Sequence, residues 1–301
     1  MSDFESLLNA IPNEPNVAFI LADYLEEQDD PRCELLRLMY TLKDIAEVTP
    51  ERVAMENRLH ELLFVENLEP VMPRYTNELG MEFVWIPPGT FTMGSPEDES
   101  GRLPKEGPAH QVKLTKGFWL GRTPVTQRQW HEVMGNNPSA FQGDENRPVE
   151  QVSWRACQQF CEKVSQRTRF PIRFPTEAQW EYACRGGIQR ARYAEDLNAI
   201  AWYGENGAMV THRVGWKRAN GWGVYDMLGN VCEWCHDGTR DYTKDAVTDP
   251  VGPTSADANR CRRGGSYWRS ALLVRAAYRV ATPPEHRGDD IGFRGSSSGI
   301  S

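Results

Sequence analysis

One short segment of the sequence has the residue types of a cofactor site. Cys232, Cys235 and His236 form a C-x-x-C-H pattern, the spacing of c-type haem attachment. Haem attachment takes place outside the cytosol, and the acidic N-terminal residues show no export signal. A zinc site and reduced thiols packed in the core are the alternatives, and we favour packed thiols. Cys157 and Cys161, one helical turn apart, are likewise typical of small buried apolar residues.

A second segment begins with a turn after which an enzyme would be expected to place reactive side chains, but no such side chain follows it. The turn Arg-Gly-Gly-Ser-Tyr at 263–267 leads into WRSALLV at 268–274, which lacks cysteine, histidine and carboxylate. Ser266 therefore has no base or thiol beside it to activate it. Tyr267, Trp268 and Arg269 are of the types that supply most binding energy at interfaces. The segment indicates a binding surface.

Acid–base chemistry has one weak candidate. His286 with Asp289 or Asp290 is the best available pair, and His286 alone is better interpreted as a contact residue. We therefore predict no catalytic residue.

The composition excludes several classes of protein. A net charge of −8 in 301 residues disfavours nucleic-acid binding, which needs a basic face. No apolar run approaches membrane-spanning length, so we expect no membrane partner. The odd number of cysteines, 7, and the lack of a visible export signal predict a cytoplasmic protein with reduced thiols.

The first 75 residues predict a small helical module. Apolar residues recur at helical spacing, and prolines at 12, 15 and 31 separate the helices. A helix over 50–63 should keep Arg52, Glu56 and Arg58 on its solvent side. Residues 21–38 resemble a short module that accompanies other domains in planctomycete-type bacteria. The module is expected to serve docking or self-association.

Residues 76–301 change to short strands, turns and aromatic residues, and predict a second domain. Thr126 is placed to cap a helix over Gln129–Val133, and another helix should cover 154–167. Thr176 with Gln179 forms a capping box for a third helix.

Seven motifs in this second part resemble the formylglycine-generating-enzyme (sulfatase-modifying factor) domain family. The resemblance implies an α+β fold of C-type-lectin-like type, with two small antiparallel sheets. The motifs are GTFTMGS (89–95), RTPVT (122–126), RPVEQVSW (147–154), FPTEAQWEYACRGG (174–187), YDMLGNVCEWC (225–235), RGGSY (263–267) and IGFR (291–294).

The resemblance also shows which metals to expect. The family's oxidases bind copper(I) through two cysteines after the RGGSY turn, since this ion prefers soft thiolates. Arg269 and Val274 occupy those positions here, and Cys261 lies before the turn. Related sulfoxide synthases hold iron through histidines of a helical domain, where this chain offers only His60. We therefore expect no copper, no haem and no formylglycine synthesis.

Calcium is the metal that the resemblance favours. The family's ion lies between positions that match Asp226, Gly229, Val231 and Glu233, and carboxylates with main-chain carbonyls suit calcium. The alternative is that Asp226 caps a turn while Glu233 pairs with an arginine. Both interpretations stay open.

The C-terminal part also resembles the variable proteins of diversity-generating retroelements, which use this domain to bind ligands. This resemblance predicts a binding surface between the fixed RGGS and GFR motifs, while Arg263, Arg275, Arg279 and Arg294 serve the scaffold through buried ion pairs. The expected partner is a protein or a small polar ligand. In that group the segment is rewritten by adenine-directed mutagenesis of a template rich in asparagine codons. An undiversified binder and an enzyme of the superfamily with another activity are the alternatives. The predicted binding residues are Tyr267, Trp268, Arg269, Ser270, Ala271, Val280, Ala281, Thr282, His286, Gly288, Asp289 and Asp290.

Overall fold

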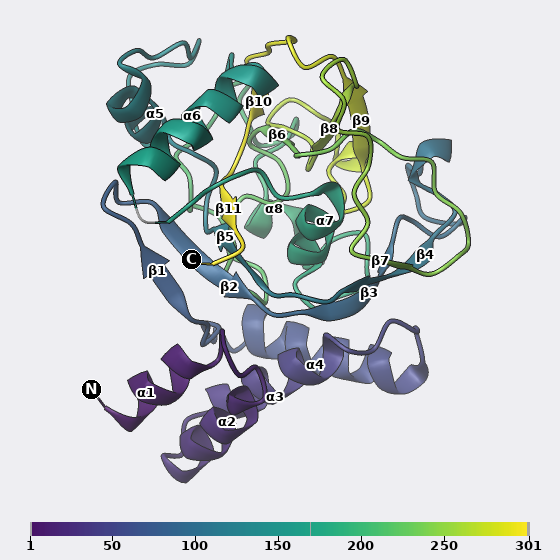
Figure 1. Ribbon diagram of the computed structural model, residues 1–301. Coiled ribbons are helices and arrows are strands. Elements are labelled where there is room, and N and C mark those ends of the chain that lie inside the picture. Colours follow the sequence, from purple (N-terminus) through teal and green to yellow (C-terminus); the bar gives the residue numbers. More distant parts are fainter. Residues whose placement is uncertain (1, 169, 300–301) are drawn as a thin grey trace.

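The computed structural model describes residues 2–168 and 170–299, and its N-terminal part is helical as predicted (Figure 1). Helix α1 begins with a capping box between Ser2 and Glu5, and α4 begins at Pro50 after the cap Thr49. The helices of this module are α1 (Asp3–Ala10), α2 (Val17–Glu27), α3 (Arg32–Leu42) and α4 (Pro50–Phe64).

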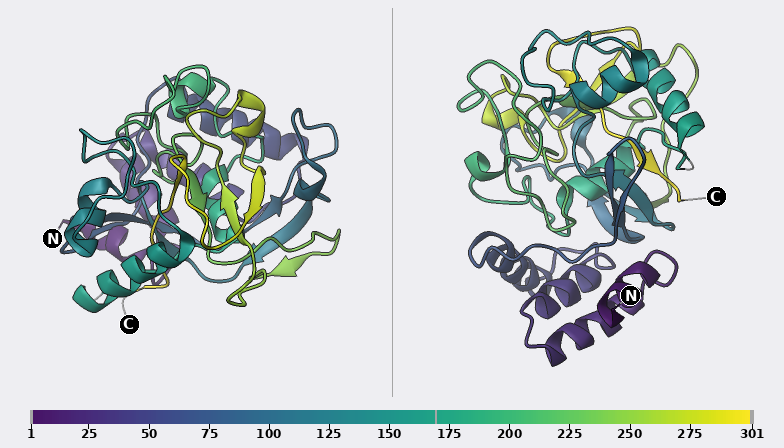
Figure 2. Two further views of the ribbon diagram at one scale, coloured as in Figure 1. Left: turned by 90° about the horizontal axis from the view of Figure 1, so that it is seen from above. Right: turned by 90° about the vertical axis from the view of Figure 1, so that its left-hand side faces the viewer.

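Helix α4 corrects one prediction. Arg52 and Glu56 are buried rather than facing solvent, and Arg52 Nε donates to Glu56 Oε1 at 2.8 Å. Arg52 also donates to the carbonyl oxygens of Leu42 at 3.0 Å and Gly187 at 2.9 Å. The predicted solvent side is covered because α4 lies against the second domain (Figures 1 and 2). Only Arg58 stays partly exposed, beside Glu34, Glu61 and Glu66.

The module and the domain share one apolar core. Buried side chains of α2, α3 and α4 belong to the same cluster as Trp85 and Trp222 of the domain. Tyr40 meets Trp222 edge-on at 6.4 Å between ring centroids, and Thr90 N donates to Lys43 O at 2.6 Å. Strand β1 (Arg74–Thr76) already belongs to the domain's first sheet, so residue 75 lies inside a strand.

The described part of the domain holds three sheets instead of the predicted two, and two of them are mixed. Strands β7, β10 and β11 are two residues long, too short to show alternation in the sequence. One antiparallel sheet has the order β1, β2 (Glu82–Ile86), β5 (Phe118–Gly121) and β11 (Ser296–Ser297). The second is β3 (Gly89–Met93), β4 (His110–Leu114) and β7 (Val247–Thr248), with β4 and β7 parallel. The third is β10 (Ile291–Gly292), β6 (Cys232–Trp234), β8 (Arg260–Arg263) and β9 (Arg279–Thr282), with β10 and β6 parallel.

The predicted helices of the domain are present. Thr126 with Gln129 and Thr176 with Gln179 form the capping boxes of two of them. The helices are α5 (Gln127–Met134), α6 (Trp154–Arg167), α7 (Glu177–Arg185) and the short α8 (Leu197–Ile200). Helix α7 is almost entirely buried, so it serves as a central support. None of the helices in residues 2–168 and 170–299 has both the length and the apolarity to cross a membrane.

Candidate binding face

Two glycines fix the turn that opens the predicted binding segment. Gly264 and Gly265 have φ of +95° and +73°, where side chains are strained. A Cβ on Gly264 would lie 2.7 Å from Met227 O, and one on Gly265 would lie 2.9 Å from Leu273 O. Both positions of the turn after β8 are therefore restricted to glycine, by their backbone conformation and by the lack of space for a Cβ.

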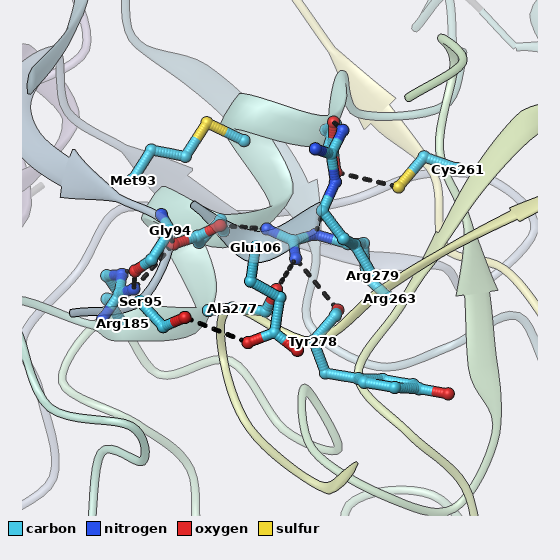
Figure 3. A network of polar contacts seen from close by, with 12 residues as sticks. Met93, Gly94, Ser95, Glu106, Arg185, Cys261, Arg263, Ala277, Tyr278 and Arg279 are labelled. Carbon is cyan, nitrogen blue, oxygen red and sulfur yellow. Dashed lines mark hydrogen bonds and ion pairs between the residues drawn. The ribbon is translucent and has the colours of Figure 1, made fainter. Parts of the chain in front are cut away.

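Beneath this turn, Arg263 ties three segments together (Figure 3). Its Nη1 donates to Ala277 O at 2.7 Å and Tyr278 O at 2.9 Å, and its Nη2 pairs with Glu181 of α7. Both side chains are buried, and the opposite charges offset each other's desolvation. The backbone on either side of the binding segment is thus held to the central helix.

Arg279 makes the matching link on β9. Its Nε and Nη2 bind the two oxygens of Glu177 at 2.7 and 2.6 Å, a bidentate geometry. Cys261 Sγ donates to the same carboxylate at 2.9 Å. Arg275 pairs with Glu106, and Arg294 pairs with Glu233. The prediction that these four arginines serve the scaffold through buried ion pairs is confirmed.

Above this support, Trp268 bridges the two ends of the segment. Its ring is 40% exposed, and its Nε1 donates to Asp290 Oδ2 at 2.9 Å. Ser266 Oγ donates to the same oxygen at 3.1 Å, and the Arg269 guanidinium lies 3.9 Å from the Trp268 ring centroid. The result is an exposed aromatic ring with a cation stacked beside it. We call the surface formed by residues 267–290 the 267–290 face; it lies near β8, β9 and β10, away from the helical module (Figure 1).

The two positions that match the copper ligands lie in different environments. Val274 is completely buried in the core, whereas Arg269 is half-buried on the surface. Leu272 is 51% exposed and so adds an apolar contact to the face instead of filling the core. Its carbonyl accepts from Arg275 Nε at 2.6 Å, which turns this short segment outward.

The twelve predicted binding residues divide by burial. Trp268, Ser270, Ala281 and His286 are exposed. The half-buried group comprises Arg269, Ala271, Val280, Gly288 and Asp289, whereas Tyr267, Thr282 and Asp290 lie beneath the surface.

The buried members support the face from within. Thr282 Oγ1 accepts from Arg262 Nε at 2.8 Å, and Tyr267 packs edge-on against Phe141 at 5.3 Å between ring centroids. Within the described residues, the side chain of His286 has no hydrogen bond to Asp289 or Asp290, so no acid–base pair is assembled.

Sequence reasoning missed one titratable group behind the face. Glu150 is completely buried and accepts from Phe141 N at 2.9 Å and Ala140 N at 3.1 Å. Burial raises the pKa of Glu150 to about 7, and the nearby charge of Asp289 acts in the same direction. The available signal was a glutamate between the apolar residues Val149 and Val152 of the motif RPVEQVSW.

The residues predicted for calcium lie on β6 and the loop before it. The Glu233 carboxylate accepts from Arg294 at 2.6 and 2.7 Å and from Trp180 Nε1 at 2.8 Å. Asp226 Oδ2 accepts from Gly215 N at 2.7 Å, while its buried Oδ1 has no hydrogen-bond partner. Burial raises the pKa of Asp226 to about 6.

These donors fit calcium in part. An ionised carboxylate offers about four lone-pair sites, so Asp226 Oδ1 and a remaining site on Glu233 Oε1 are available. The described residues contain no group of three His, Cys, Asp or Glu side chains that could hold a metal. An ion here would also need the main-chain oxygens of Gly229 and Val231 that the resemblance implies.

The cysteines of the C-x-x-C-H segment are free and buried. Burial raises the pKa of the Cys232 and Cys235 thiols, which disfavours the thiolates that zinc requires. Cys157 and Cys161 are also buried and free. These environments agree with packed thiols.

Comparison with known proteins gives the chain a family. The model of the sulfatase-modifying factor enzyme 1-like domain matches residues 69–296. The formylglycine-generating enzyme of Mus musculus is 31% identical over 205 residues, which cover 62% of this chain and 52% of that enzyme. The enzyme of Thermomonospora curvata is 28% identical over 295 residues, covering 73% of this chain and 95% of its own. The chain thus spans about half the length of the mouse protein.

Two solved structures are similar over the whole domain. Treponema denticola variable protein 1 has a TM-score of 0.67 and 30% identity, with 77% of this chain and 100% of that chain covered. PvdO of Pseudomonas aeruginosa has a TM-score of 0.68 and 27% identity, with 76% of this chain and 99% of that chain covered.

Proposed function

This chain belongs to the sulfatase-modifying factor enzyme 1-like domain family, and we propose that it uses the family scaffold to bind a ligand without transforming it. The predicted fold class, an α+β C-type-lectin-like domain of formylglycine-generating-enzyme type with N-terminal helices, is confirmed. The 267–290 face is the proposed binding surface, and a protein or a small polar molecule is the proposed ligand.

The observation that carries this proposal is the environment of the two copper-ligand positions. Copper(I) needs a converging pair of thiolates. Here one position is Arg269, whose guanidinium is stacked on Trp268, and the other is Val274, sealed in the core. Trp268 and Leu272 present apolar area to solvent beside a cation, a combination typical of binding sites.

The likeness to Treponema denticola variable protein 1 supports a more specific form of the proposal, in which the face is diversified. The turn glycines and the buried arginines hold the backbone, so exposed side chains such as Ala281 and His286 can change at little cost to the fold. Trp268 is an exception, because it does not arise from an asparagine codon by changes at adenines.

An enzyme with a different activity is the second candidate, because several curated relatives are formylglycine-generating enzymes. Glu150 favours this candidate, since a carboxyl group with a pKa of about 7 suits general acid–base catalysis. It is completely buried behind Tyr267, however, and its two N–H donors satisfy it, so it has no path to a substrate.

Calcium bound by Asp226, Gly229, Val231 and Glu233 is part of the proposal. It would act as structural support, since these residues lie on and before β6, next to β8 in the same sheet. Asp226 Oδ1 has no hydrogen-bond partner and is available to an ion, which supports this assignment. The pairing of Glu233 with Arg294 already neutralises the second carboxylate, which weakens it.

The proposed test compares captured partners. Full-length protein and the double variant Trp268→Ala/Arg269→Ala are used as baits. The matched control is Arg213→Ala/Trp216→Ala, another exposed pair in which the guanidinium lies 5.2 Å from the ring. We expect the first pair of changes to abolish a partner that the control retains. Identical partner profiles for both variants would show that this face is not the recognition surface.

Diversification has its own test. The DNA downstream of the gene is sequenced and searched for a reverse-transcriptase frame beside a near-copy of the 3′ end. Adenines in the copy should occur where codons for residues 267–290 differ. If the locus has neither the reverse-transcriptase frame nor the near-copy, the proposal is reduced to a binding protein whose face is not diversified.

A further inference from the structure

A hollow lies away from the 267–290 face, where the helical module and the domain meet. Its volume is about 280 Å³, and it is lined by the end of α4, the connection to β1, and the loop of residues 217–225. The charged and aromatic lining residues are Glu69, Arg74, Arg122, Lys217, Arg218 and Tyr225. None of its lining residues belongs to the 267–290 face.

The charges in this hollow are unbalanced. Within the described part of the chain, no carboxylate lies within ion-pair distance of Arg74, Lys217 or Arg218. Arg122 pairs with Glu82 at 2.5 Å, and Glu69 is the acidic residue of the lining. Two positive charges are left in excess, in a chain whose net charge is −8. Cations gathered in a cleft with low-dielectric walls produce a strong local positive potential.

Two of the guanidinium groups are held in place before any ligand arrives. Arg218 donates to the carbonyl oxygens of Phe64 at 2.8 Å and Leu63 at 2.5 Å, and it stacks on the Phe64 ring at 4.9 Å. Arg122 lies 5.2 Å from the centroid of the Tyr225 ring. A ligand therefore does not have to order these long side chains, which lowers the entropic cost of binding.

Lys217 is the third ordered cation. Its Nζ donates to Asn198 O at 2.5 Å and lies 3.8 Å from the Trp202 ring centroid. Burial lowers the pKa of Lys217, as expected for a cation without a close anionic partner. An anion in the hollow would stabilise this charge.

We propose that this hollow binds a small phosphate-bearing molecule. The Arg74 guanidinium makes no hydrogen bond or ion pair in the described residues and offers a fork that matches the oxygen geometry of a phosphate. Arg218 and Lys217, which already donate to main-chain carbonyls, add positive charge beside it. The volume is near the lower end of the ~300–1,000 Å³ of drug-sized ligand sites, which favours a phosphate ion or a small monoester. Because Arg218 is bonded to the end of α4 and Arg74 lies on β1, the ligand would also fasten the module to the domain.

The test uses the full chain with inorganic phosphate and with phenyl phosphate, each against chloride at equal ionic strength. Isothermal titration calorimetry and thermal melting are the measurements. We expect saturable binding of at least one phosphate probe and a rise in melting temperature that chloride does not give. Equal affinity for both probes would indicate a free phosphate ion, and tighter binding of phenyl phosphate would indicate a monoester. No binding beyond the effect of ionic strength overturns the proposal.

Two substitutions locate the site. Arg74→Gln removes a side chain that makes no hydrogen bond or ion pair in the described residues, so the fold should be unaffected. Together with Lys217→Gln it should weaken phosphate binding at least about tenfold, the loss expected for charge-assisted hydrogen bonds. Lys163→Gln/Lys244→Gln, which also removes two positive charges at exposed positions, is the matched control. Equal affinity in the double variant and the control would place the phosphate elsewhere and refute the assignment.

Discussion

Asp226→Asn should stabilise the metal-free protein at neutral pH, although it removes a charge from the proposed calcium site. The carboxyl group is almost completely buried, and burial raises its pKa to about 6. Asparagine has the same shape and tolerates the left-handed backbone of this residue, whose φ is +53°. The substitution therefore mimics the protonated aspartic acid at every pH.

The direction of this change in stability follows from the linkage between protonation and folding. Because the pKa of Asp226 is higher in the folded chain than in the unfolded one, its contribution favours folding at low pH and is lost as the pH rises through about 6. The shift from the ordinary value near 3.9 corresponds to a penalty of roughly 3 kcal/mol at pH 7.5 and about 1 kcal/mol at pH 4.5. At ~2 °C per kcal/mol for a chain of this size, the variant should melt roughly 5 °C higher at pH 7.5.

The assay is thermal unfolding of both proteins in EDTA at pH 4.5 and pH 7.5. Asp241→Asn, an exposed aspartate, controls for the change in net charge. An advantage of the variant that does not grow between pH 4.5 and pH 7.5 would refute the reasoning about burial.

Added calcium separates the two interpretations of Asp226. If an ion binds, the wild-type protein should gain about 2.7 kcal/mol at a calcium concentration 100 times the dissociation constant, and the variant should gain little. If calcium leaves the wild-type melting temperature unchanged, the turn-capping interpretation stands alone.

Three further predictions concern stability and activity. Arg52→Met should cost about 3–5 kcal/mol, because it removes the close ion-pair partner of buried Glu56, which keeps the N–H of Gln189 at 3.0 Å and Arg190 Nε at 4.0 Å. Adding Glu56→Gln should recover part of this loss in denaturant unfolding, and a loss below about 1 kcal/mol would contradict a buried pair. A fragment beginning at residue 69, where the family match starts, should melt cooperatively but at a lower temperature than the full chain, since Trp222 loses the Tyr40 ring that packs against it; equal melting temperatures would mean that the module adds no stability. Protein incubated with copper(I), oxygen and a CxPxR peptide should leave the peptide mass unchanged, and the aldehyde mass would overturn the proposed loss of this activity.

Much of the fold could be predicted because the sequence patterns that indicate its helices are local. The capping boxes at Thr126 and Thr176 and the bounds of α6 follow from residue types three or four positions apart. The scaffold role of Arg263 and Arg279 was predicted together with the binding segment that these two residues flank or belong to. These features depend little on distant segments.

The errors arise where a distant segment decides the outcome. Arg52 and Glu56 have the pattern of a solvent-facing pair, and only the domain packed over α4 buries them. The parallel pairs that make two of the sheets mixed depend on β7 and β10, two-residue strands that pair with distant neighbours and carry no periodicity. Leu272 and Val274 are alike in type, yet the turn at η2 (Ala271–Leu273) points one outward and seals the other in the core.

The arrangement of charges separates the residues that stabilise this domain from those of the proposed binding face. Arg263 and Arg279 are held by Glu181 and Glu177 of the buried helix α7, so breaking either pair would cost about 3–5 kcal/mol. Exposed residues above them, such as Ser270 and Ala281, have no side-chain hydrogen bonds or ion pairs in the described residues, and substitutions of this kind usually stay within about 0.5 kcal/mol. A surface built in this way can change its ligand while the supporting backbone stays in place.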